Sequence, residues 1–381
     1  MDQSTSTRVR EIKAAIGKML EERHRLGGST GNRERPSTYW ASFCSRFSYM
    51  LGLPEEAFEQ LRIHTYHLTG DSYLTYFFDA GAREFRRERA ASLDGIPAQY
   101  WLYEPNGGIG FSSEGGLVSH DTQRFQHVVN TLYREGTIEA LKRPVGGRSL
   151  VLEIGAGYGG LAHHLTSLLD LTYVIVDLPE TLLFSASYLA MLHPTRNSYI
   201  YSPETFAEFL KTDVLSYDFV FIPNYRVEEL GALSFDLVLN VASFQEMRED
   251  QVGVYLDFIS RTCGGTFFSW NQDAQPKNGE LHSLSEMLRQ RFALKEVTWV
   301  GQDRWLARVL KAFTVRAEAA SLSEHLRGLA GRIFRSAAWR IDPLPAEFNR
   351  PYREFICATR SSTNSDAKAE RNRIGTPPLG T

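Results

Sequence analysis

Cysteine is scarce in this chain, with three residues among 381. Cys44, Cys263 and Cys357 are scattered, form no C-x-x-C pair and have no histidine nearby at the spacing of a zinc site. Secreted domains that depend on disulfides are rich in paired cysteines, whereas proteins of reducing compartments keep a few free thiols. The pattern predicts a reducing environment and argues against a cysteine-bound zinc ion.

An excess of charge of either sign is also missing. The 42 Lys and Arg residues nearly balance 45 Asp and Glu residues, which gives a net charge of -3 and an isoelectric point near 6.4. Proteins that bind nucleic acid or anionic membranes through charge carry a clear positive excess. The balance predicts no overall attraction to nucleic acid or to a membrane surface.

Long apolar runs are absent as well. No stretch approaches the roughly 18 apolar residues that are needed to span a bilayer. The N-terminal stretch MDQSTSTRVREIKAAIGKML carries charges throughout, whereas a signal peptide contains a continuous apolar segment. We therefore expect a soluble, cytoplasmic protein.

The length and a hydrophobic content of 43% allow a core domain with accessory regions. We expect an N-terminal helical accessory or substrate-lid region, a loop and helix that lead into the core, the core itself, a helical insertion with a final strand, and a disordered tail. These five parts are predicted at residues 1–103, 104–148, 149–310, 311–360 and 361–381. The oligomeric state is left open.

Apolar strands alternate with amphipathic helices from residue 149 onward. The segments SLVLEIG, TYVIVDL, DFVFIP, FDLVLNV and GTFFSWN are apolar nearly throughout, which is typical of strands buried on both faces of a parallel sheet. Residues 194–217 exceed a normal connection and predict an insertion. ALKEVTWVG (293–301) and YREFICAT (352–359) predict two last strands, an antiparallel pair. The expected fold is α/β, with a doubly wound, Rossmann-like sheet that binds ligands at the carboxyl ends of its strands.

The segments outside this alternation are less regular. Residues 25–38 have the composition of a linker, and residues 40–89 predict helices whose aromatic side chains pack together or roof a pocket. The glycine-rich stretch 104–121 predicts a loop without regular structure near the site, followed by one helix over 121–141. Residues 304–340 hold eight Lys or Arg against two Glu. They predict a basic amphipathic helix that faces solvent, a membrane surface or a phosphorylated substrate.

The stretch VLEIGAGYGG (151–160) carries the main functional signal. Gly155, Gly157 and Gly160 satisfy the dinucleotide pattern G-x-G-x-x-G, while Glu153 with Gly155, Gly157 and Gly159 satisfies the E-x-G-x-G-x-G pattern of S-adenosyl-L-methionine (SAM) methyltransferases. Glycine spacing alone does not separate the two cofactors.

The charge of Glu153 separates them. A dinucleotide places a pyrophosphate over the glycine loop, close to this carboxylate, whereas SAM has no phosphate and presents a cationic ammonium group. At about 4 Å the sign of a charge is worth a few kcal/mol in a partly shielded cleft. Glu153 therefore favours SAM.

Further cofactor contacts are expected at the ends of the next strands. Asp177 ends the second strand, where a carboxylate can hold ribose hydroxyls in either cofactor class; its alternative role is that of a helix N-terminal carboxylate before Pro179. Asn224 after the third strand is placed beside the adenine. The predicted cofactor set also includes backbone neighbours and residues after the fourth strand, and comprises Glu153, Gly155, Ala156, Gly157, Asp177, Leu178, Asn224, Asn240 and Ser243.

Methyl transfer to an alcohol requires a positioned hydroxyl and a base that removes its proton. The stretch FDLVLNVASFQEM (235–247) leaves the sheet where the methyl group would be delivered, together with Gln245 and Glu246. Four residues with polar side chains are expected near this end of the sheet and are candidates for the base: Glu246, His120, Asp121 and Asp273. Each is equally well explained as a surface or helix-capping group. His164 is expected to pack rather than to react.

A metal ion is not predicted. Glu246, Asp250 and Asp273 are carboxylates near the expected acceptor, but their spacing matches no ligand pattern.

With these residues in view, the sequence resembles a bacterial family of sugar O-methyltransferases within the class I SAM-dependent methyltransferases. The resemblance rests on VLEIGAGYGGLA (151–162), YVIVDLPETLLFSASYL (173–189) and FDLVLNVASFQEM (235–247), with weaker support from WVGQDRWLARV (299–309). It covers roughly residues 100–310. It implies that Glu153, Gly155, Gly157 and Asp177 are cofactor residues.

We therefore predict a SAM-dependent O-methyltransferase whose partner is a small polar acceptor, a sugar or glycoside of a natural-product or polysaccharide pathway. A non-sugar natural product or a phosphorylated acceptor is the alternative within the same class. An NAD-dependent oxidoreductase would use the same glycines but needs a Tyr/Lys or Cys/His arrangement that the sequence does not show. A non-catalytic module with a methyltransferase-like fold is the third hypothesis.

Overall fold

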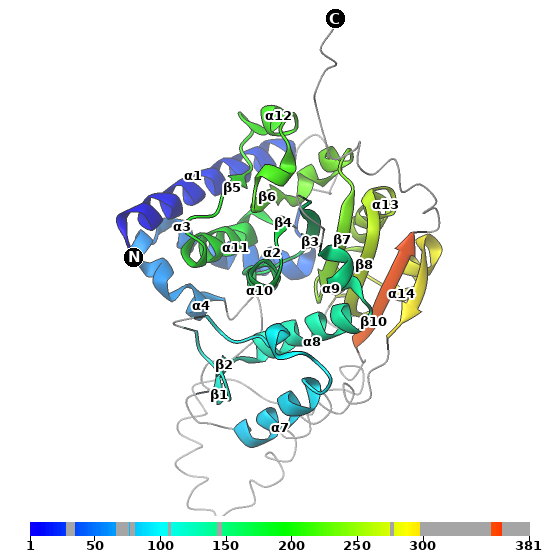
Figure 1. The fold of residues 1–381 in the computed structure, drawn as a ribbon. Helices are drawn as coiled ribbons and strands as arrows, with labels where there is room; N and C mark the ends of the chain where they lie inside the picture. The colour runs from blue at the N-terminus through cyan, green and yellow to red at the C-terminus, as the bar shows by residue number, and fades with distance from the viewer. Residues whose placement is uncertain are drawn as a thin grey trace, which may run out of the picture.

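The computed structural model describes residues 1–27, 35–65, 76, 81–105, 108–142, 147–274, 278–297 and 352–359. The basic segment expected at 304–340, the tail expected at 361–381 and the motif at 299–309 lie outside these residues. Across the described part the chain forms one large sheet flanked by helices, with a helical N-terminal region beside it (Figure 1).

The sheet contains eight strands among the described residues, in the order β5-β6-β4-β3-β7-β8-β10-β9. The strands are β3 (Ser149–Ile154), β4 (Leu171–Asp177), β5 (Ser198–Ile200), β6 (Phe219–Pro223), β7 (Phe235–Val241), β8 (Cys263–Gln272), β9 (Phe292–Glu296) and β10 (Tyr352–Thr359). The first six in the spatial order are parallel to one another, and β10 runs antiparallel to both β8 and β9. The predicted α/β class, the doubly wound Rossmann-like sheet and the antiparallel last pair are confirmed.

The direction of winding reverses at β3. From β3 the chain moves outward through α10 (Gly160–Leu168) to β4 and through α11 (Pro179–Leu192) to the edge strand β5, and then returns to β6, which lies between β5 and β4. On the other side, β7 leads through α13 (Glu249–Thr262) to β8. Because parallel crossovers are right-handed, the two directions place their helices on opposite faces. The strands β3 and β7 are neighbours at the reversal, which is where such sheets bind ligands.

The N-terminal region is helical, as expected. It comprises α1 (Gln3–Leu26), α2 (Thr38–Phe47), α3 (Tyr49–Gly52), the 3-10 turn η2 (Glu55–Gln60), α4 (Leu61–His64) and α7 (Ala82–Ser92). The α1 helix starts at Asp2, whose carboxylate accepts from the Thr5 N–H. It buries Val9, Ile12, Ile16 and Met19 on one stripe and lies along α11 (Figure 1).

Three expectations for the connections need correction. The stretch 104–121 is not without regular structure, because β1 (Phe111–Ser113) pairs antiparallel with β2 (Gly116–Val118); Gly115, with φ of 94°, permits the turn. The single helix expected over 121–141 is two helices, α8 (His120–Arg134) and α9 (Thr137–Leu141), because Gly136 has a φ of 75°. The segment 194–217 contributes the edge strand β5 to the sheet.

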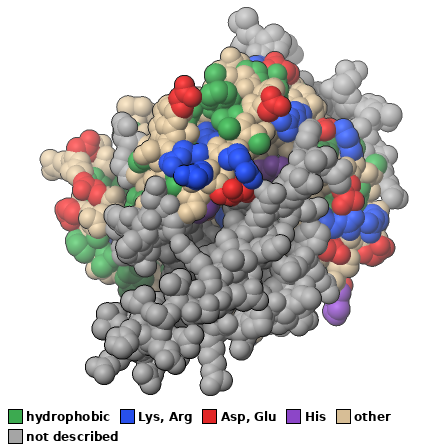
Figure 2. All heavy atoms as spheres, turned by 90° about the horizontal axis from the view of Figure 1, so that it is seen from below, with side chains coloured by type: hydrophobic (Ala, Val, Ile, Leu, Met, Phe, Trp, Pro, Cys, Tyr) green, Lys and Arg blue, Asp and Glu red, His purple; other side chains and the backbone are tan. Residues whose placement is uncertain are grey.

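The surface charges are mixed. On the described part of the face seen from below, Lys and Arg side chains lie beside Asp and Glu side chains (Figure 2), in keeping with the small net charge. In the described ranges, no helix combines the length and apolarity required to cross a membrane.

Candidate functional site

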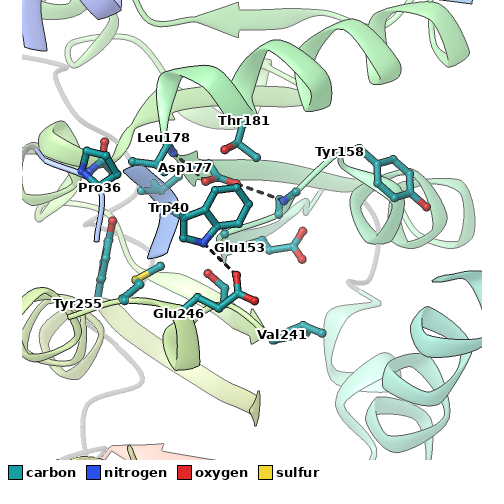
Figure 3. Close-up of a pocket in the computed structure, with 18 of the residues that line it drawn as sticks. Pro36, Trp40, Glu153, Tyr158, Asp177, Leu178, Thr181, Val241, Glu246 and Tyr255 are labelled. Carbon is teal, nitrogen blue, oxygen red and sulfur yellow. Dashed lines mark hydrogen bonds between the residues drawn. The ribbon is translucent and has the colours of Figure 1, made fainter. Parts of the chain in front are cut away.

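A cavity of about 120 Å³ lies at the carboxyl ends of β3, β4 and β7 (Figure 3). Its wall includes most of the residues predicted from the sequence. These are Glu153, Gly155, Ala156, Gly157, Asp177, Leu178, Asn224, Ser243 and Glu246, together with Asp121. Strands that end at the same sheet edge bring these residues together although they are far apart in the sequence.

The glycine loop lies between β3 and α10. Gly155 and Gly157 have φ angles of 76° and 59°, which side chains rarely adopt. The Gly155 N–H donates to the Val176 carbonyl at 2.9 Å and the Gly157 N–H to Asp177 Oδ2 at 3.2 Å. A Cβ atom on Gly155 would lie 1.8 Å from Ser243 Oγ, whereas one on Gly157 would meet nothing within 4 Å. The loop is thus held against β4 and against the exit of β7.

A Gly155→Ala variant is expected to lower the free energy of unfolding by about 3 kcal/mol, because left-handed backbone strain adds to the overlap with Ser243. Gly157→Ala is the matched control. It incurs similar backbone strain, about 1–2 kcal/mol, without the overlap. Urea denaturation measures both, and equal losses in the two variants would contradict the packing that we describe.

Two carboxyl groups face the cavity from neighbouring strand ends. Glu153 is 2% exposed and accepts a hydrogen bond from the Tyr173 hydroxyl at 2.8 Å. Burial, with a smaller contribution from the charge of Asp177, raises the pKa of Glu153 to about 8. Burial also raises the pKa of Asp177 to about 7, although the Leu178 and Gly157 N–H groups donate to its oxygens. Both groups gain from a ligand that supplies positive charge or hydrogen-bond donors.

Asn224 adds an acceptor on the same side of the cavity. It follows Pro223, which pairs in register with Asp177 across β6 and β4. Its Oδ1 atom is buried and has no hydrogen-bond partner among the described residues. A buried polar atom that lacks a partner and lines a cavity is suited to a ligand that donates a hydrogen bond.

The cavity wall also carries Glu246 and a cluster on α8. The Trp40 indole Nε1–H donates to Glu246 Oε2 at 2.9 Å (Figure 3), and the Ser37 hydroxyl donates to the Glu246 carbonyl at 2.6 Å. Asp121 is fully buried, with Arg124 Nη1 at 3.1 Å and Arg62 Nη1 at 3.5 Å from its oxygens. Asp121, Arg124 and Glu246 all line the cavity, so this part of the wall is polar and charged.

The exit of β7 has an unusual backbone. Ala242, between Asn240 and the cavity residue Ser243, has a φ of 54°. Asn240 does not line the cavity; it lies beneath the loop, donates to the Ile154 carbonyl at 2.8 Å and accepts from the Phe244 N–H at 3.1 Å. These two bonds hold the β7 exit against the end of β3, and the predicted cofactor contact of Asn240 stays a prediction.

His120 and Asp273 are not among the residues that line this cavity. The His120 ring is surrounded by Tyr76, Phe85 and Phe111, and burial lowers its pKa to about 4. Asp273 accepts from the Ser285 N–H at 2.6 Å at the start of α14 (Leu284–Arg291), which is the capping role considered as its alternative. Neither residue is brought together with the glycine loop.

Several cavity residues were not predicted from the sequence. Trp40 and Ser37 come from the N-terminal region, Phe125 and Arg124 from α8, and Tyr158 from the glycine loop itself. Trp40 belongs to the aromatic segment for which a pocket roof was one alternative, and it is 206 residues from Glu246. No local spacing signals such a contact. His164, expected to pack, is buried against Phe125.

Over the residues that the structure describes, no group of three or more His, Cys, Asp or Glu side chains is arranged to hold a metal ion.

No family model matches the sequence, and no curated protein matches it. Among solved structures, the chain is similar to phosphoethanolamine N-methyltransferase 2 of Haemonchus contortus in complex with S-adenosyl-L-methionine, with 15% identity, a TM-score of 0.33, and coverage of 60% of this chain and 53% of that chain. It is also similar to an O-methyltransferase family protein from Burkholderia thailandensis, with 13% identity, a TM-score of 0.33, and coverage of 64% and 62%. The chain thus spans less than two thirds of either protein. At this distance, the likeness assigns neither a family nor an activity.

Proposed function

We propose that this protein is a SAM-dependent methyltransferase that transfers a methyl group to a hydroxyl of a small polar acceptor, a sugar or glycosylated metabolite. The observation that carries the proposal is the pair of buried carboxyl groups, Glu153 and Asp177, beside a glycine loop at the reversal of a doubly wound sheet. SAM supplies an electrophilic methyl group on a sulfonium.

The donor and acceptor groups of the cavity fit SAM. Glu153 suits the ammonium side of the cofactor, and Asp177 suits ribose hydroxyls. The unpartnered Asn224 Oδ1 suits the amine of adenine. All three are acceptors, and SAM presents donors or positive charge to each of them. The open space beside Gly157 leaves room for the close approach of a ligand to the backbone.

A dinucleotide fits the same cavity less well. Its pyrophosphate would lie near Glu153, and like charges at short distance repel in a partly buried site. Glu153 therefore argues against the NAD-dependent alternative, whereas Asp177 suits the ribose of either cofactor.

A polar acceptor is supported by the other side chains of the cavity wall. Asp121, Arg124 and Glu246 offer hydrogen bonds of both kinds, while Trp40 and Phe125 offer apolar ring surface. Sugars present hydroxyls at their edges and C–H groups on their faces, so this combination supports a sugar or glycoside. Glu246 is our candidate for the base that receives the hydroxyl proton.

Calorimetry with S-adenosylhomocysteine tests the cofactor assignment, with NAD as the comparison ligand. We expect S-adenosylhomocysteine to bind and NAD not to bind. Absence of S-adenosylhomocysteine binding would overturn the proposal. A screen for SAM consumption over sugars, glycosides, phosphorylated sugars and phenolic metabolites, with mass measurement of the product, then identifies the acceptor class. A protein that binds the cofactor but methylates nothing would favour the non-catalytic module.

The affinity for S-adenosylhomocysteine is expected to rise about 25-fold between pH 6 and 7.5, because the ligand ammonium needs the ionised form of Glu153. The pKa of Glu153 is raised to about 8, so its protonated form dominates at pH 6. The pH dependence of the folding stability of the ligand-free protein has the opposite sign. Because the pKa of Glu153 is higher in the folded chain than in the unfolded chain, its protonated carboxyl group contributes stability that is fully present below the unfolded pKa. That contribution is lost as the pH rises through about 8.

Calorimetry across this pH range measures the effect, with Glu153→Gln as the control. The variant should bind more weakly at pH 7.5 and show a shallower pH dependence. An affinity that falls as the pH rises would contradict the assignment of Glu153 to the ammonium group.

A further inference from the structure

The helix α1 reaches the candidate cofactor site at its carboxyl end, where two consecutive charged residues contact different strand ends. We infer that Glu22 and Arg23 are positioning residues of the cofactor site, because each holds one of the two segments that carry Asn224 and Asp177. The inference rests on the proposed SAM-binding function, and its test separates the two.

Arg23 holds the start of α11. Its Nη1 and Nη2 atoms donate to Glu180 Oε2 and Oε1 at 2.9 and 2.5 Å. Glu180 is 7% exposed and belongs to the first turn of α11, three residues after Asp177. A two-point contact between a guanidinium and a carboxylate fixes direction as well as distance. It therefore orients the turn from Asp177 to Thr181, which lines the cavity.

Glu22 holds η5 (Asn224–Leu230), the 3-10 helix that follows β6. The carboxylate is 7% exposed, accepts from the Tyr201 hydroxyl at 2.7 Å and pairs with the Arg226 guanidinium. The Tyr225 hydroxyl lies 3.0 Å from the same carboxylate. Tyr225 and Arg226 directly follow Asn224, so Glu22 fixes the segment that presents the Asn224 acceptor to the cavity.

The sheet itself does not supply this support. The ladder between β4 and β6 ends at the register pair of Asp177 and Pro223, and the cofactor-facing groups lie at or just beyond that point. Segments beyond the last ladder bond depend on other contacts for their order. The α1 helix provides them from outside the sheet, so an element with no residue in the cavity wall sets the geometry of its adenosine side.

The test compares ligand affinities of α1 variants by calorimetry. The ligands are S-adenosylhomocysteine and 5′-methylthioadenosine, which share the adenosine group but differ in the amino-acid group. The variants are Glu22→Gln, Arg23→Gln and the conservative Arg23→Lys. Two controls also remove polar anchors of α1 but far from the cavity. Arg8→Gln loses contacts to the Pro194 and Arg196 carbonyls at 2.8 Å, and Lys13→Gln loses a contact to the Leu53 carbonyl at 2.6 Å.

We expect Glu22→Gln and Arg23→Gln to bind both ligands about tenfold more weakly, because the ligand must then order segments that are preorganised in the wild type. The loss should be equal for the two ligands, since adenosine is the shared part. Arg23→Lys should fall between the wild type and Arg23→Gln, because it keeps the charge without the two-point contact. The two controls should stay within about twofold of the wild type.

The inference is overturned if Glu22→Gln and Arg23→Gln both bind as tightly as the wild type. It is also overturned if the two controls lose as much affinity as these variants at a comparable drop in melting temperature. A wild type that binds neither ligand refutes the proposed function, and this inference with it. Tyr225→Phe removes a single hydroxyl from the Glu22 cluster, and it carries the same expectation if Glu22→Gln does not fold.

Discussion

An Asp177→Asn variant is expected to bind S-adenosylhomocysteine about a hundredfold more weakly than the wild type. The carboxylate accepts from two backbone N–H groups, those of Gly157 and Leu178, and it lines the cavity. An amide has one acceptor oxygen and turns its own NH₂ group toward a donor, so a charge-assisted bond becomes a repulsive contact. Loss of one or two charge-assisted hydrogen bonds from the ribose hydroxyls of the ligand to Asp177 amounts to about 3 kcal/mol, which corresponds to the expected change in affinity.

Asp236→Asn is the matched control for this experiment. Asp236 is a buried carboxylate on β7 that accepts from the Leu150 N–H at 2.9 Å, near the amino ends of β3 and β7. The two substitutions remove the same charge, one at the carboxyl ends and the other at the amino ends of the strands of one sheet. The control should lower the melting temperature yet retain the ligand affinity. Equal affinity losses in both variants would show that general destabilisation, rather than contact with the ligand, explains the effect of Asp177→Asn.

The residues at the carboxyl ends of the parallel strands could be predicted from the sequence because their placement depends on local features. A buried apolar strand followed by glycines or by a carboxylate fixes where each side chain leaves the sheet, and parallel strands bring their ends to one edge. For this reason Glu153, Gly155, Asp177 and Asn224 meet in one cavity. The role of each toward the cofactor is still a prediction.

The other half of the cavity could not be predicted in the same way. The contact of Trp40 with Glu246 and that of Arg62 with Asp121 join elements whose packing depends on the whole N-terminal region. For polar residues near the expected site, the sequence also could not distinguish a structural role from a catalytic one. His120 became part of an aromatic cluster and Asp273 a helix cap, because local hydrogen bonds and burial compete with catalytic placement for the same residue types. Glu246 and Asp121 remain as cavity-lining candidates for the base.

Glu246 and Asp121 differ in their neighbours. Asp121 lies between the guanidinium groups of Arg62 and Arg124, which hold its carboxylate in place. The Trp40 indole Nε1–H donates to Glu246 Oε2 and orients that carboxylate in the cavity wall. Glu246 also follows the exit of β7, where the methyl group would be delivered, and it stays our candidate for the base.

A Glu246→Gln variant is expected to lower the turnover number by about 10²–10⁴-fold with an acceptor found in the SAM-consumption screen, because general-base catalysis contributes a factor of that size. Its affinity for S-adenosylhomocysteine should stay within about threefold, since the amide oxygen can still accept from Trp40.

Asp121→Asn is the comparison variant and should raise the KM for the acceptor more than it lowers turnover. Trp40→Phe keeps the ring but removes the N–H, so it should lower turnover by about tenfold through a less ordered Glu246. If Asp121→Asn abolishes turnover while Glu246→Gln remains active, the proton is taken by the buried α8 carboxylate, and its two arginines must then serve to hold the acceptor.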